Sequence, residues 1–377
     1  FYQREFAFAR FKCNVYSYST KNDGVLPMIT LRKALLGSSA IWLFASATAA
    51  QELNALVWCD HADEALIKPF EEQHDVKVNL REYEGTGAAL ALLEQSRPGD
   101  WDVLVIDGID VFRTVETGLL APLPKDELPI GDMFPEVVME ENNSKDGVWY
   151  AVTEKFGYNT ISYNSEKVDV SDMQNLATVW SDKYSGRISI YDYYLPVMGL
   201  AAISEGIETS KINENSLDEI SPVLTQMRAS AASVAGVVAA QTALATGEVD
   251  IVVGGGEWLT AVLAEEQPEM TWTIPDQGAV RWTQSIGMLA DSEKKDLALE
   301  FIKYIVSPEG QARLSTSSCF WGMPANANAG DILSKDQKAV LRWDEQGEFL
   351  SRTQLYPAPS TELDIAMQDL WLDKLSQ

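Results

Sequence analysis

Strand-like and helix-like segments alternate along the chain from residue 55, and this alternation restricts the fold more than any other feature of the sequence. The apolar patterns typical of strands cover residues 55–58, 76–80, 101–106, 161–163, 188–191 and 249–253. Helical patterns cover residues 63–73, 88–94, 111–117, 217–228, 237–246 and 297–306. Such alternation predicts an α/β fold with mostly parallel sheets and helices on both faces, divided into two lobes. Ligands bind such sheets beyond the carboxyl ends of the strands, which here means the loops after Val57, Ile106, Tyr191 and Val253.

Length and charge narrow the function further. A chain of 377 residues exceeds the usual size of a single core and favours two compact units. Fifty-six acidic residues against 29 basic ones give a formal net charge of −27. Binding to nucleic acid or to an anionic lipid surface needs a basic patch, so we expect neither as a partner.

The segment from Met28 has the features of a secretory signal peptide. Arg32 and Lys33 precede a short apolar run at residues 34–45, and small residues follow up to Ala50. We therefore predict a signal peptide at residues 28–50, and we interpret residues 1–27 as upstream translated sequence with Met28 as the start. The buried apolar helix is the alternative for this segment.

Removal of the first 50 residues would change the charge and leave two cysteines. That segment holds six of the bases and two of the acids, so the remaining chain would carry −31. We interpret this charge as the solvated surface of an exported protein and expect the protein in the periplasm without a lipid anchor. Cys59 and Cys319 either form one disulfide in that oxidising compartment or remain two thiols, and the sequence leaves both possibilities open.

Short motifs occur in a fixed order between residues 56 and 324. They are Trp58-Cys59-Asp60-His61, residues 70–73 with 76–78, Tyr83-Glu84, residues 101–105, 118–123, 157–159 with 163–164, 247–249, 274–279 and 282–285. In this order and spacing they resemble the periplasmic spermidine/putrescine-binding protein family of ABC transporters. The resemblance covers about 270 residues, although each motif alone is weak.

The resemblance implies a two-lobed, type II periplasmic binding protein fold with a ligand cleft between lobes that close on the solute. Lobe 1 is expected to comprise residues 51–157 with 283–326, and lobe 2 residues 158–282 with 327–377. The implied partners are a small amine-containing molecule and an inner-membrane ABC permease. We expect a monomer that needs no cofactor or resident metal and catalyses no reaction.

In that family, aromatic walls pack against the alkyl chain of the ligand and carboxylates pair with its ammonium groups. The matching ligand-facing positions here are Trp58, Asp60, His61, Trp282 and Trp321. A core tryptophan is the alternative for Trp58, and a solvated loop histidine is the alternative for His61.

Other positions depart from the family pattern. Tyr193 and Pro196 stand where the family has acids, Gly255 replaces a tryptophan, Gln284 replaces an aspartate, and Asp107 replaces a serine. Three positions that pair with amines have lost their charge, whereas one acid has appeared. We therefore favour a ligand with one cationic amine, its other end being neutral, hydroxylated or carboxylated, over a polyamine.

Four further residues bear on this choice. Glu257 and Trp258 follow three glycines and either replace the missing acid and aromatic group or begin a surface helix. Lys155 and Arg281 either meet a ligand carboxylate or are solvated bases. The sequence does not decide between these alternatives.

Two other functions have some support in the residues. A ferric or other metal-ion-binding protein of the same fold is suggested by the ligand types at residues 59–61 and by Tyr193-Tyr194. In ferric-ion-binding proteins, however, the tyrosine pair follows the strand that corresponds to residues 249–253. An enzyme is disfavoured because Cys59 and His61 share one loop, and because no zinc-protease, phosphate-loop or dinucleotide motif is present.

Overall fold

The computed structural model describes residues 51–375, so the predicted signal peptide and the predicted upstream segment lie outside the described residues. Its strands are β1 (Gln51–Val57), β2 (Val76–Glu82), β3 (Val103–Asp107), β4 (Ser144–Lys145), β5 (Val148–Trp149), β6 (Ala151–Asn164), β7 (Ile188–Tyr191), β8 (Ala231–Ala235), β9 (Ile251–Gly255), β10 (Met270–Thr273), β11 (Ala279–Met288), β12 (Met323–Pro324) and β13 (Thr353–Leu355). Its α-helices are α1 (Glu64–His74), α2 (Thr86–Gln95), α3 (Val111–Glu116), α4 (Glu140–Asn143), α5 (Leu176–Val179), α6 (Tyr194–Ser204), α7 (Glu214–Ser230), α8 (Val237–Thr246), α9 (Glu257–Ala264), α10 (Lys295–Ile305), α11 (Pro308–Ser315), α12 (Lys335–Val340), α13 (Gln346–Arg352) and α14 (Thr361–Lys374).

The main sheet is continuous and has the strand order β2-β1-β3-β11-β6-β9-β7-β8. At one end β1 pairs in parallel with β2 and β3, and at the other end β7 pairs in parallel with β8 and β9. The strands in the middle, β3, β11, β6 and β9, pair antiparallel. The predicted parallel pairing is therefore found in the two outer sets, and antiparallel pairs join them.

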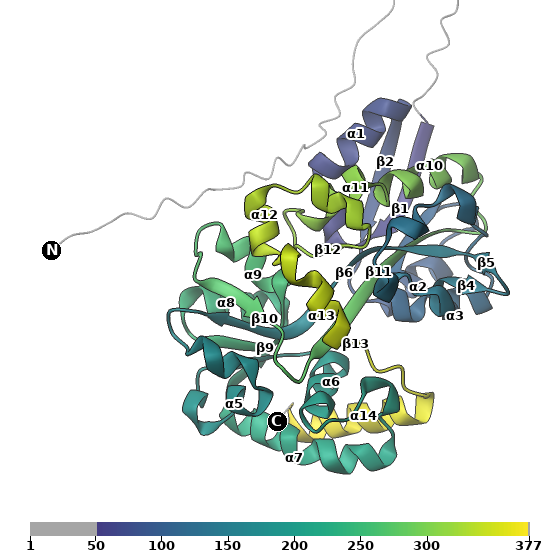
Figure 1. Cartoon of the computed structure of the whole chain (residues 1–377). Helices are drawn as coiled ribbons and strands as arrows, with labels where there is room; N and C mark the ends of the chain where they lie inside the picture. The colour runs from purple at the N-terminus through teal and green to yellow at the C-terminus, as the bar shows by residue number, and fades with distance from the viewer. Residues whose placement is uncertain (1–50, 376–377) are drawn as a thin grey trace, which may run out of the picture. The chain divides into compact units, whose positions relative to one another are not determined.

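The long strands β6 and β11 run between the two outer sets (Figure 1). All 14 residues of β6 are buried. Its first half pairs with β11, and its second half pairs with β9 and β10. The register places Gly157 opposite Trp282, next to the residues at which we expect the chain to cross between lobes. The lobe boundaries themselves stay a prediction.

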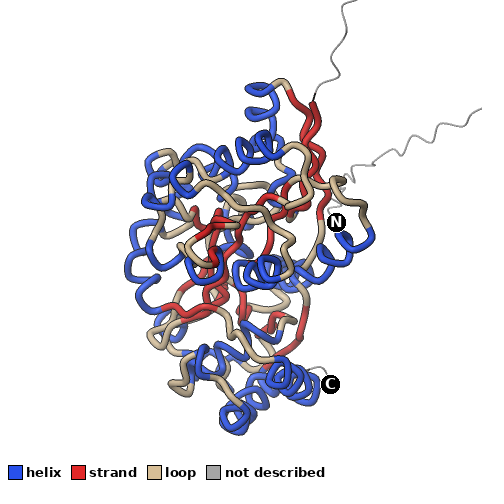
Figure 2. Tube along the Cα trace, turned by 90° about the vertical axis from the view of Figure 1, so that its right-hand side faces the viewer, coloured by secondary structure: helices blue, strands red, loops and turns tan. Residues whose placement is uncertain are grey.

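Helices lie on both sides of the strands (Figure 2). As the helical pattern predicts, α1 buries Leu66, Ile67 and Phe70. The Phe70 ring packs edge-on against Phe301 of α10, with 5.0 Å between ring centroids. In the other outer set, α6 buries every residue from Leu195 to Ile203. Each set therefore has its own helical cover, which holds the ends of β6 and β11 in place.

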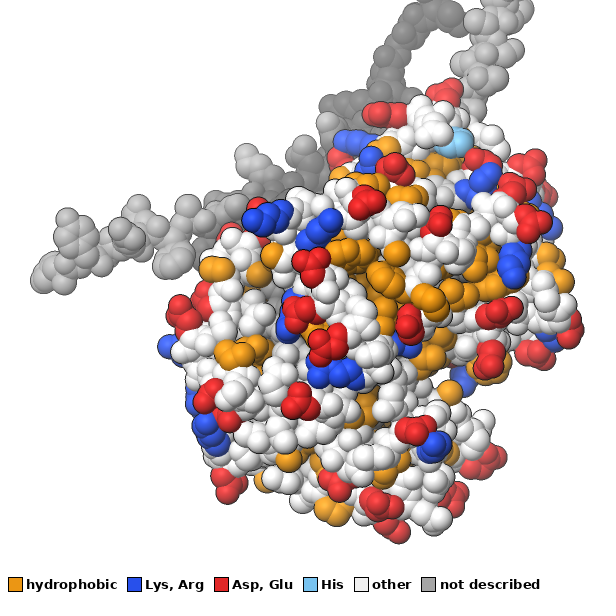
Figure 3. Space-filling view, in the orientation of Figure 1, with side chains coloured by type: hydrophobic (Ala, Val, Ile, Leu, Met, Phe, Trp, Pro, Cys, Tyr) orange, Lys and Arg blue, Asp and Glu red, His pale blue; other side chains and the backbone are white. Residues whose placement is uncertain are grey.

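Acidic and basic side chains are scattered over the face seen in Figure 3, and hydrophobic side chains gather in its middle. This distribution agrees with a solvated acidic surface. Among residues 51–375, no helix is both long enough and apolar enough to span a bilayer.

Candidate functional site

The first loop places two polar residues inside the protein. β1 ends at Val57, and Trp58 leads into a short 3-10 turn at Cys59–Ala62. Asp60 and His61 in this turn are fully buried, so His61 is not a solvated loop histidine. Trp58 is partly exposed, and its indole N–H donates to the hydroxyl of Tyr83 at 3.0 Å. The loop therefore presents one aromatic residue outward and two titratable residues inward.

A disulfide joins Cys59 to Cys319, with 6.0 Å between the Cα atoms and 260 positions between them in the sequence. The structure thereby selects the bridge from the two possibilities that the sequence leaves open. The bond ties the first loop to the segment that carries Phe320 and Trp321. These two parts of the chain together surround the buried polar residues.

We expect Cys59 and Cys319 to be unreactive toward alkylating reagents in denaturant without reductant, and reactive after reduction. Peptide mass spectrometry checks this, and two alkylated cysteines without reductant would contradict the bridge. Because the bond closes a long loop, replacing both cysteines by serine should lower the free energy of unfolding by about 2 to 5 kcal/mol. The comparison with the reduced parent protein is the control, since both lack the bond.

A buried charge cluster lies next to the first loop. The ammonium group of Lys155 donates to Asp60 Oδ2 at 2.9 Å and to the backbone carbonyl of Phe320 at 3.0 Å. The His61 ring lies between two carboxylates, with Nδ1 2.9 Å from Asp60 and Nε2 3.1 Å from Glu154. All four charged side chains, Asp60, His61, Glu154 and Lys155, are fully buried.

An amide completes this charge cluster. Gln284 Nε2 donates to Glu154 Oε1 at 3.1 Å and lies 3.3 Å from Asp60 Oδ2. Gln284, which stands where the similar family has an aspartate, therefore hydrogen-bonds to side chains of the protein itself. Buried charges are stable only when they are paired and hydrogen-bonded, and each member here has such partners.

A β-bulge explains how neighbouring residues join the same cluster. In β6, Lys155 pairs with Gln284 and Thr153 pairs with Ser285, so Glu154 is an extra residue between them. Successive side chains in a regular strand point to opposite faces, whereas a bulge redirects one of them. Glu154 and Lys155 therefore both reach the first loop.

The cluster fixes its own protonation. Burial disfavours the charged form of His61, but the carboxylates of Glu154 and Asp60 outweigh it and raise the pKa of His61 to about 10. Burial also disfavours ionised Asp60, and the charges of Lys155 and His61 reverse this and hold its pKa well below its usual range. The two acidic and two basic side chains of the cluster are therefore paired with one another.

A second group of residues contains Asp107 at the end of β3 and several tyrosines. Asp107 is only partly exposed. Its partial burial and the nearby charge of Asp110 raise its pKa to about 7. Tyr193 directly precedes α6, and its ring centroid lies 6.0 Å from that of Tyr191 and 5.8 Å from that of Tyr356. Burial and the charge of Asp107 raise the pKa of both Tyr191, to about 12, and Tyr193. These phenols therefore remain protonated hydrogen-bond donors at neutral pH.

Glu257 lies against β6. It is the first residue of α9 and is fully buried, so it starts a helix without being a surface residue. Its carboxylate accepts hydrogen bonds from the backbone N–H of Tyr158 at 3.2 Å. Burial outweighs both these bonds and the charge of Lys155, and it raises the pKa of Glu257 to about 8. Trp258 is also buried, and its indole N–H donates to the carbonyl of Tyr158 at 3.0 Å.

Gly157 allows Glu257 and Trp282 to approach the same strand. A Cβ atom at this position would lie 1.8 Å from Glu257 Oε1 and 2.4 Å from the ring of Trp282. Glycine is therefore needed here for close approach. The indole ring of Trp282 is in turn 6.4 Å from the ring of Phe320 and roughly perpendicular to it.

The structure thus divides the predicted ligand-facing positions. Asp60, His61 and Gln284 lie in the charge cluster, and Asp107 and Tyr193 lie in the tyrosine group. Glu257 and Trp282 meet at Gly157, whereas Trp58 precedes Cys59 of the disulfide and Trp321 follows Cys319 by two residues. Their contact with a ligand stays a prediction. Three neighbours of these positions are not among the predicted residues, namely Phe320, Tyr356 and Glu154. The acid–base pair Glu154-Lys155 inside an otherwise apolar and aromatic stretch is the signal that could have revealed the cluster.

Arg281 faces elsewhere. Its guanidinium donates to the Thr353 hydroxyl at 2.9 Å and to the carbonyl of Glu136 at 3.0 Å. Cys59 is bonded to Cys319 and offers no thiolate to a metal. Within the described part of the chain, no group of three or more His, Cys, Asp or Glu side chains is arranged to hold a metal ion.

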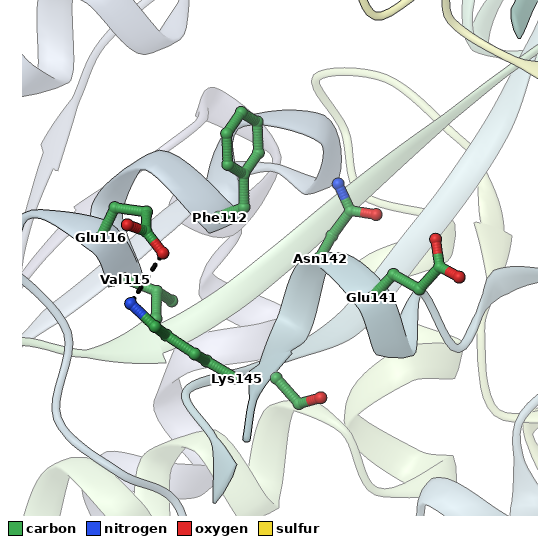
Figure 4. A pocket seen from close by; sticks show the side chains of 7 residues that line it. Phe112, Val115, Glu116, Glu141, Asn142 and Lys145 are labelled. Atoms are coloured by element: carbon green, nitrogen blue, oxygen red, sulfur yellow. Dashed lines mark hydrogen bonds and ion pairs between the residues drawn. The ribbon is translucent and has the colours of Figure 1, made fainter. Parts of the chain in front are cut away.

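An open pocket lies between α3 and α4, apart from the predicted positions (Figure 4). It is lined by Phe112, Val115, Glu116, Glu141, Asn142, Ser144 and Lys145. An ion pair of 2.7 Å between Lys145 and Glu116 crosses it. None of the predicted ligand-facing residues contributes to this pocket.

Solved structures of other proteins share this fold. A spermidine/putrescine ABC transporter substrate-binding protein from Streptococcus pneumoniae aligns with a TM-score of 0.73 and 18% identity, over 86% of this chain and 98% of that chain. A GABA receptor aligns with a TM-score of 0.68 and 17% identity, over 87% and 98%. The predicted two-lobed periplasmic binding protein fold is confirmed.

The sequence comparison identifies the family. Residues 65–340 match the bacterial extracellular solute-binding protein family, and the chain belongs to it. A curated relative is the spermidine/putrescine-binding periplasmic protein of Escherichia coli K12, which is 23% identical over 283 residues, covering 73% of this chain and 79% of the relative. The relative is named for binding a solute in the periplasm and not for a reaction.

Proposed function

We propose that the chain is the substrate-binding component of a polyamine-type ABC importer and works in the periplasm as a monomer. It captures a small solute with one cationic amine between its lobes and delivers it to a membrane permease. The family supports the solute-binding role, and the relative named for spermidine and putrescine supports an amine as ligand.

An unpaired carboxyl group next to an aromatic ring supports the cationic end. Among the described residues, Glu257 forms no ion pair, whereas Asp60 is paired with Lys155 and His61. Glu257 lies beside the indole of Trp282. An ammonium group next to an aromatic face and a carboxylate gains both cation–π and charge-assisted hydrogen-bond energy. The pairing of Glu257 with Trp282 is the observation that carries the proposal.

The second end of the ligand is expected to be neutral, hydroxylated or carboxylated. Lys155 and Arg281 already have internal partners and offer no open cation to a carboxylate. The ring centroid of Tyr191 lies 5.4 Å from that of Trp258, the neighbour of Glu257 in α9, and Tyr193 lies next to Tyr191. The hydroxyl groups of these tyrosines can hydrogen-bond to a hydroxyl or to a carboxylate. This favours amino alcohols and short amino acids over dications.

Calorimetric titration of the purified protein with 4-amino-1-butanol, 4-aminobutyrate, betaine, putrescine and spermidine tests the proposal. We expect a dissociation constant in the micromolar range, about −8 kcal/mol, for an amino alcohol or an amino acid. Butyrate and 1-butanol, which lack the amine, are the matched control ligands and should not bind. Micromolar binding of spermidine with no response to the monoamines would contradict it.

The affinity for a monoamine is expected to increase by about tenfold or more from about pH 6 to about pH 8.5. Glu257, the carboxyl group that we assign to the ligand ammonium, has a pKa of about 8 and is protonated at the lower end of this range. A neutral carboxyl group cannot pair with an ammonium group, so binding below this value must release a proton. Titrations at several pH values measure the change.

The stability of the ligand-free protein supplies an independent readout. The carboxyl groups of Asp107 and Glu257 both have a higher pKa in the folded protein than in the unfolded chain, so the folded state holds more protons above about pH 4. Their contribution to the free energy of unfolding must therefore fall as the pH rises toward 8. A Glu257→Gln variant is the control and should lose the upper part of both pH dependences. An affinity that is constant across the range would contradict this assignment.

A further inference from the structure

The ammonium group of Lys155 occupies a site with the chemistry of a ligand-ammonium site. A carboxylate oxygen of Asp60 lies at 2.9 Å, a carbonyl oxygen of Phe320 at 3.0 Å, and the centroid of the Phe320 ring at 4.1 Å. A carboxylate, a further acceptor and an aromatic face are the groups that stabilise a desolvated organic cation. The chain itself supplies the cation here, and the side chain of Lys155 is fully buried.

This internal cation lies next to the wall that the proposed ligand uses. A Cβ atom at Gly322 would be 2.6 Å from Lys155 Cε and 3.0 Å from the ring of Trp282, so the two side chains meet at this glycine. Glu257 meets the same indole at Gly157. Lys155 and Glu257 therefore flank Trp282, one bringing a positive charge and the other a carboxyl group without an ion pair.

The charges around Lys155 leave no place for a second ligand ammonium. Asp60 and Glu154 are balanced by Lys155 and His61, and both carboxylates already accept hydrogen bonds from Gln284. A second ammonium group on the side of Trp282 that faces Lys155 would meet the cations Lys155 and His61 and no free carboxylate. Like charges in such a site disfavour each other, which is a direct means of rejecting a ligand.

We propose that Lys155 is a specificity-determining residue, which fills from within the chain the position of a second ammonium group and so makes the site selective for monoamines over diamines. The inference rests on the proposed function, since it concerns the choice among amines. A merely structural Lys155 would affect stability, or the affinity for all amines alike. A selectivity role changes the ratio of affinities for two ligands that differ only in their second charge.

The test compares putrescine with 4-amino-1-butanol, which has the same four-carbon chain and a hydroxyl in place of one amine. In the unaltered protein the amino alcohol should bind about tenfold more tightly or better. In Lys155→Gln, whose amide can still donate to Asp60 and to the carbonyl of Phe320, the cluster gains a net negative charge. The preference should then reverse in favour of putrescine by about tenfold.

Two further variants control for charge and for packing. Lys155→Arg keeps the positive charge and should keep the preference for the amino alcohol. Lys155→Gln combined with Asp60→Asn removes the surplus negative charge and should lose the gain in putrescine affinity. The melting temperature of each variant shows whether it folds, and Lys155→Met replaces Lys155→Gln if the latter does not.

The outcomes separate the inference from the proposed function. If the unaltered protein binds putrescine more tightly than the amino alcohol, Lys155 does not exclude a second ammonium and the inference is overturned, while the amine-binding function stands. The inference is also overturned if the ratio of the affinities for putrescine and 4-amino-1-butanol is the same in Lys155→Gln or Lys155→Met as in the unaltered protein. If neither ligand binds the unaltered protein, the proposed function fails and the inference fails with it. Should no neutral variant fold, the ratio in the unaltered protein decides.

Discussion

Replacing Glu257 by glutamine is expected to weaken the binding of a monoamine about 100-fold. Glutamine keeps the size of the side chain and an acceptor for the N–H of Tyr158, but it removes the buried carboxylate that we assign to the ligand ammonium. Loss of one partner from a buried, hydrogen-bonded charge pair commonly costs about 2 to 5 kcal/mol. Calorimetric titration with 4-amino-1-butanol measures the change.

Glu257→Gln should weaken ligand binding, but it should not lower the free energy of unfolding of the ligand-free protein. Burial raises the pKa of Glu257 to about 8, which means that holding a carboxylate there opposes folding at higher pH. The glutamine variant should therefore be at least as stable as the parent above about pH 8. Glu265→Gln, an exposed change at the end of the same helix, is the matched control and should alter neither property. An unchanged affinity in Glu257→Gln would show that the ligand amine binds elsewhere.

Asp60→Ala is expected to lower the free energy of unfolding by about 3 to 5 kcal/mol. The variant leaves the fully buried ammonium of Lys155 with the carbonyl and ring of Phe320 but without a counter-charge. It also removes one of the two carboxylates that flank His61. Chemical denaturation followed by tryptophan fluorescence measures the loss.

A double-mutant cycle isolates the pairing with Lys155. Adding Lys155→Met to Asp60→Ala removes the unpaired charge and should restore part of the stability, because the two side chains contact each other. Glu208→Ala breaks an exposed pair with Lys211 and should change stability by less than about 1 kcal/mol. If Asp60→Ala costs no more than Glu208→Ala, the cluster is not the stabilising unit that its geometry indicates.

The sequence predicts the outer parts of the fold better than its middle. The predicted strand at residues 188–191 and the predicted helix at residues 237–246 coincide with β7 and α8. Their apolar patterns reflect burial against neighbours in the same half of the chain. Of β6, only residues 161–163 were predicted, and β11 was not predicted as a strand. Both carry charged residues on buried faces. The distant first loop neutralises those of β6, and this contact is not visible in a local pattern.

The separation along the sequence of residues that contact each other also limits the prediction of the site. Trp282 and Glu257 could be selected from the chemistry of their side chains, and the structure brings them together at Gly157. Asp60 was selected as a partner for a ligand ammonium, whereas its neighbour in the structure is the ammonium of Lys155. That contact joins residues 95 positions apart and depends on the bulge at Glu154. Register shifts of one residue are set by pairing between strands, so spacing along the chain does not report them.

The disulfide also has a mechanical consequence. Because Cys59 and Cys319 are joined, the 260-position segment that they enclose is a covalent ring, and β6, β7, β9 and β11 all belong to it. A force applied to the two ends of the oxidised chain is transmitted through the bond and can extend only the segments outside the ring. An unfolding machine that pulls from either terminus would therefore stop at the bridge, or it would have to pass two segments of polypeptide chain side by side. Reduction of the bond would remove this obstacle.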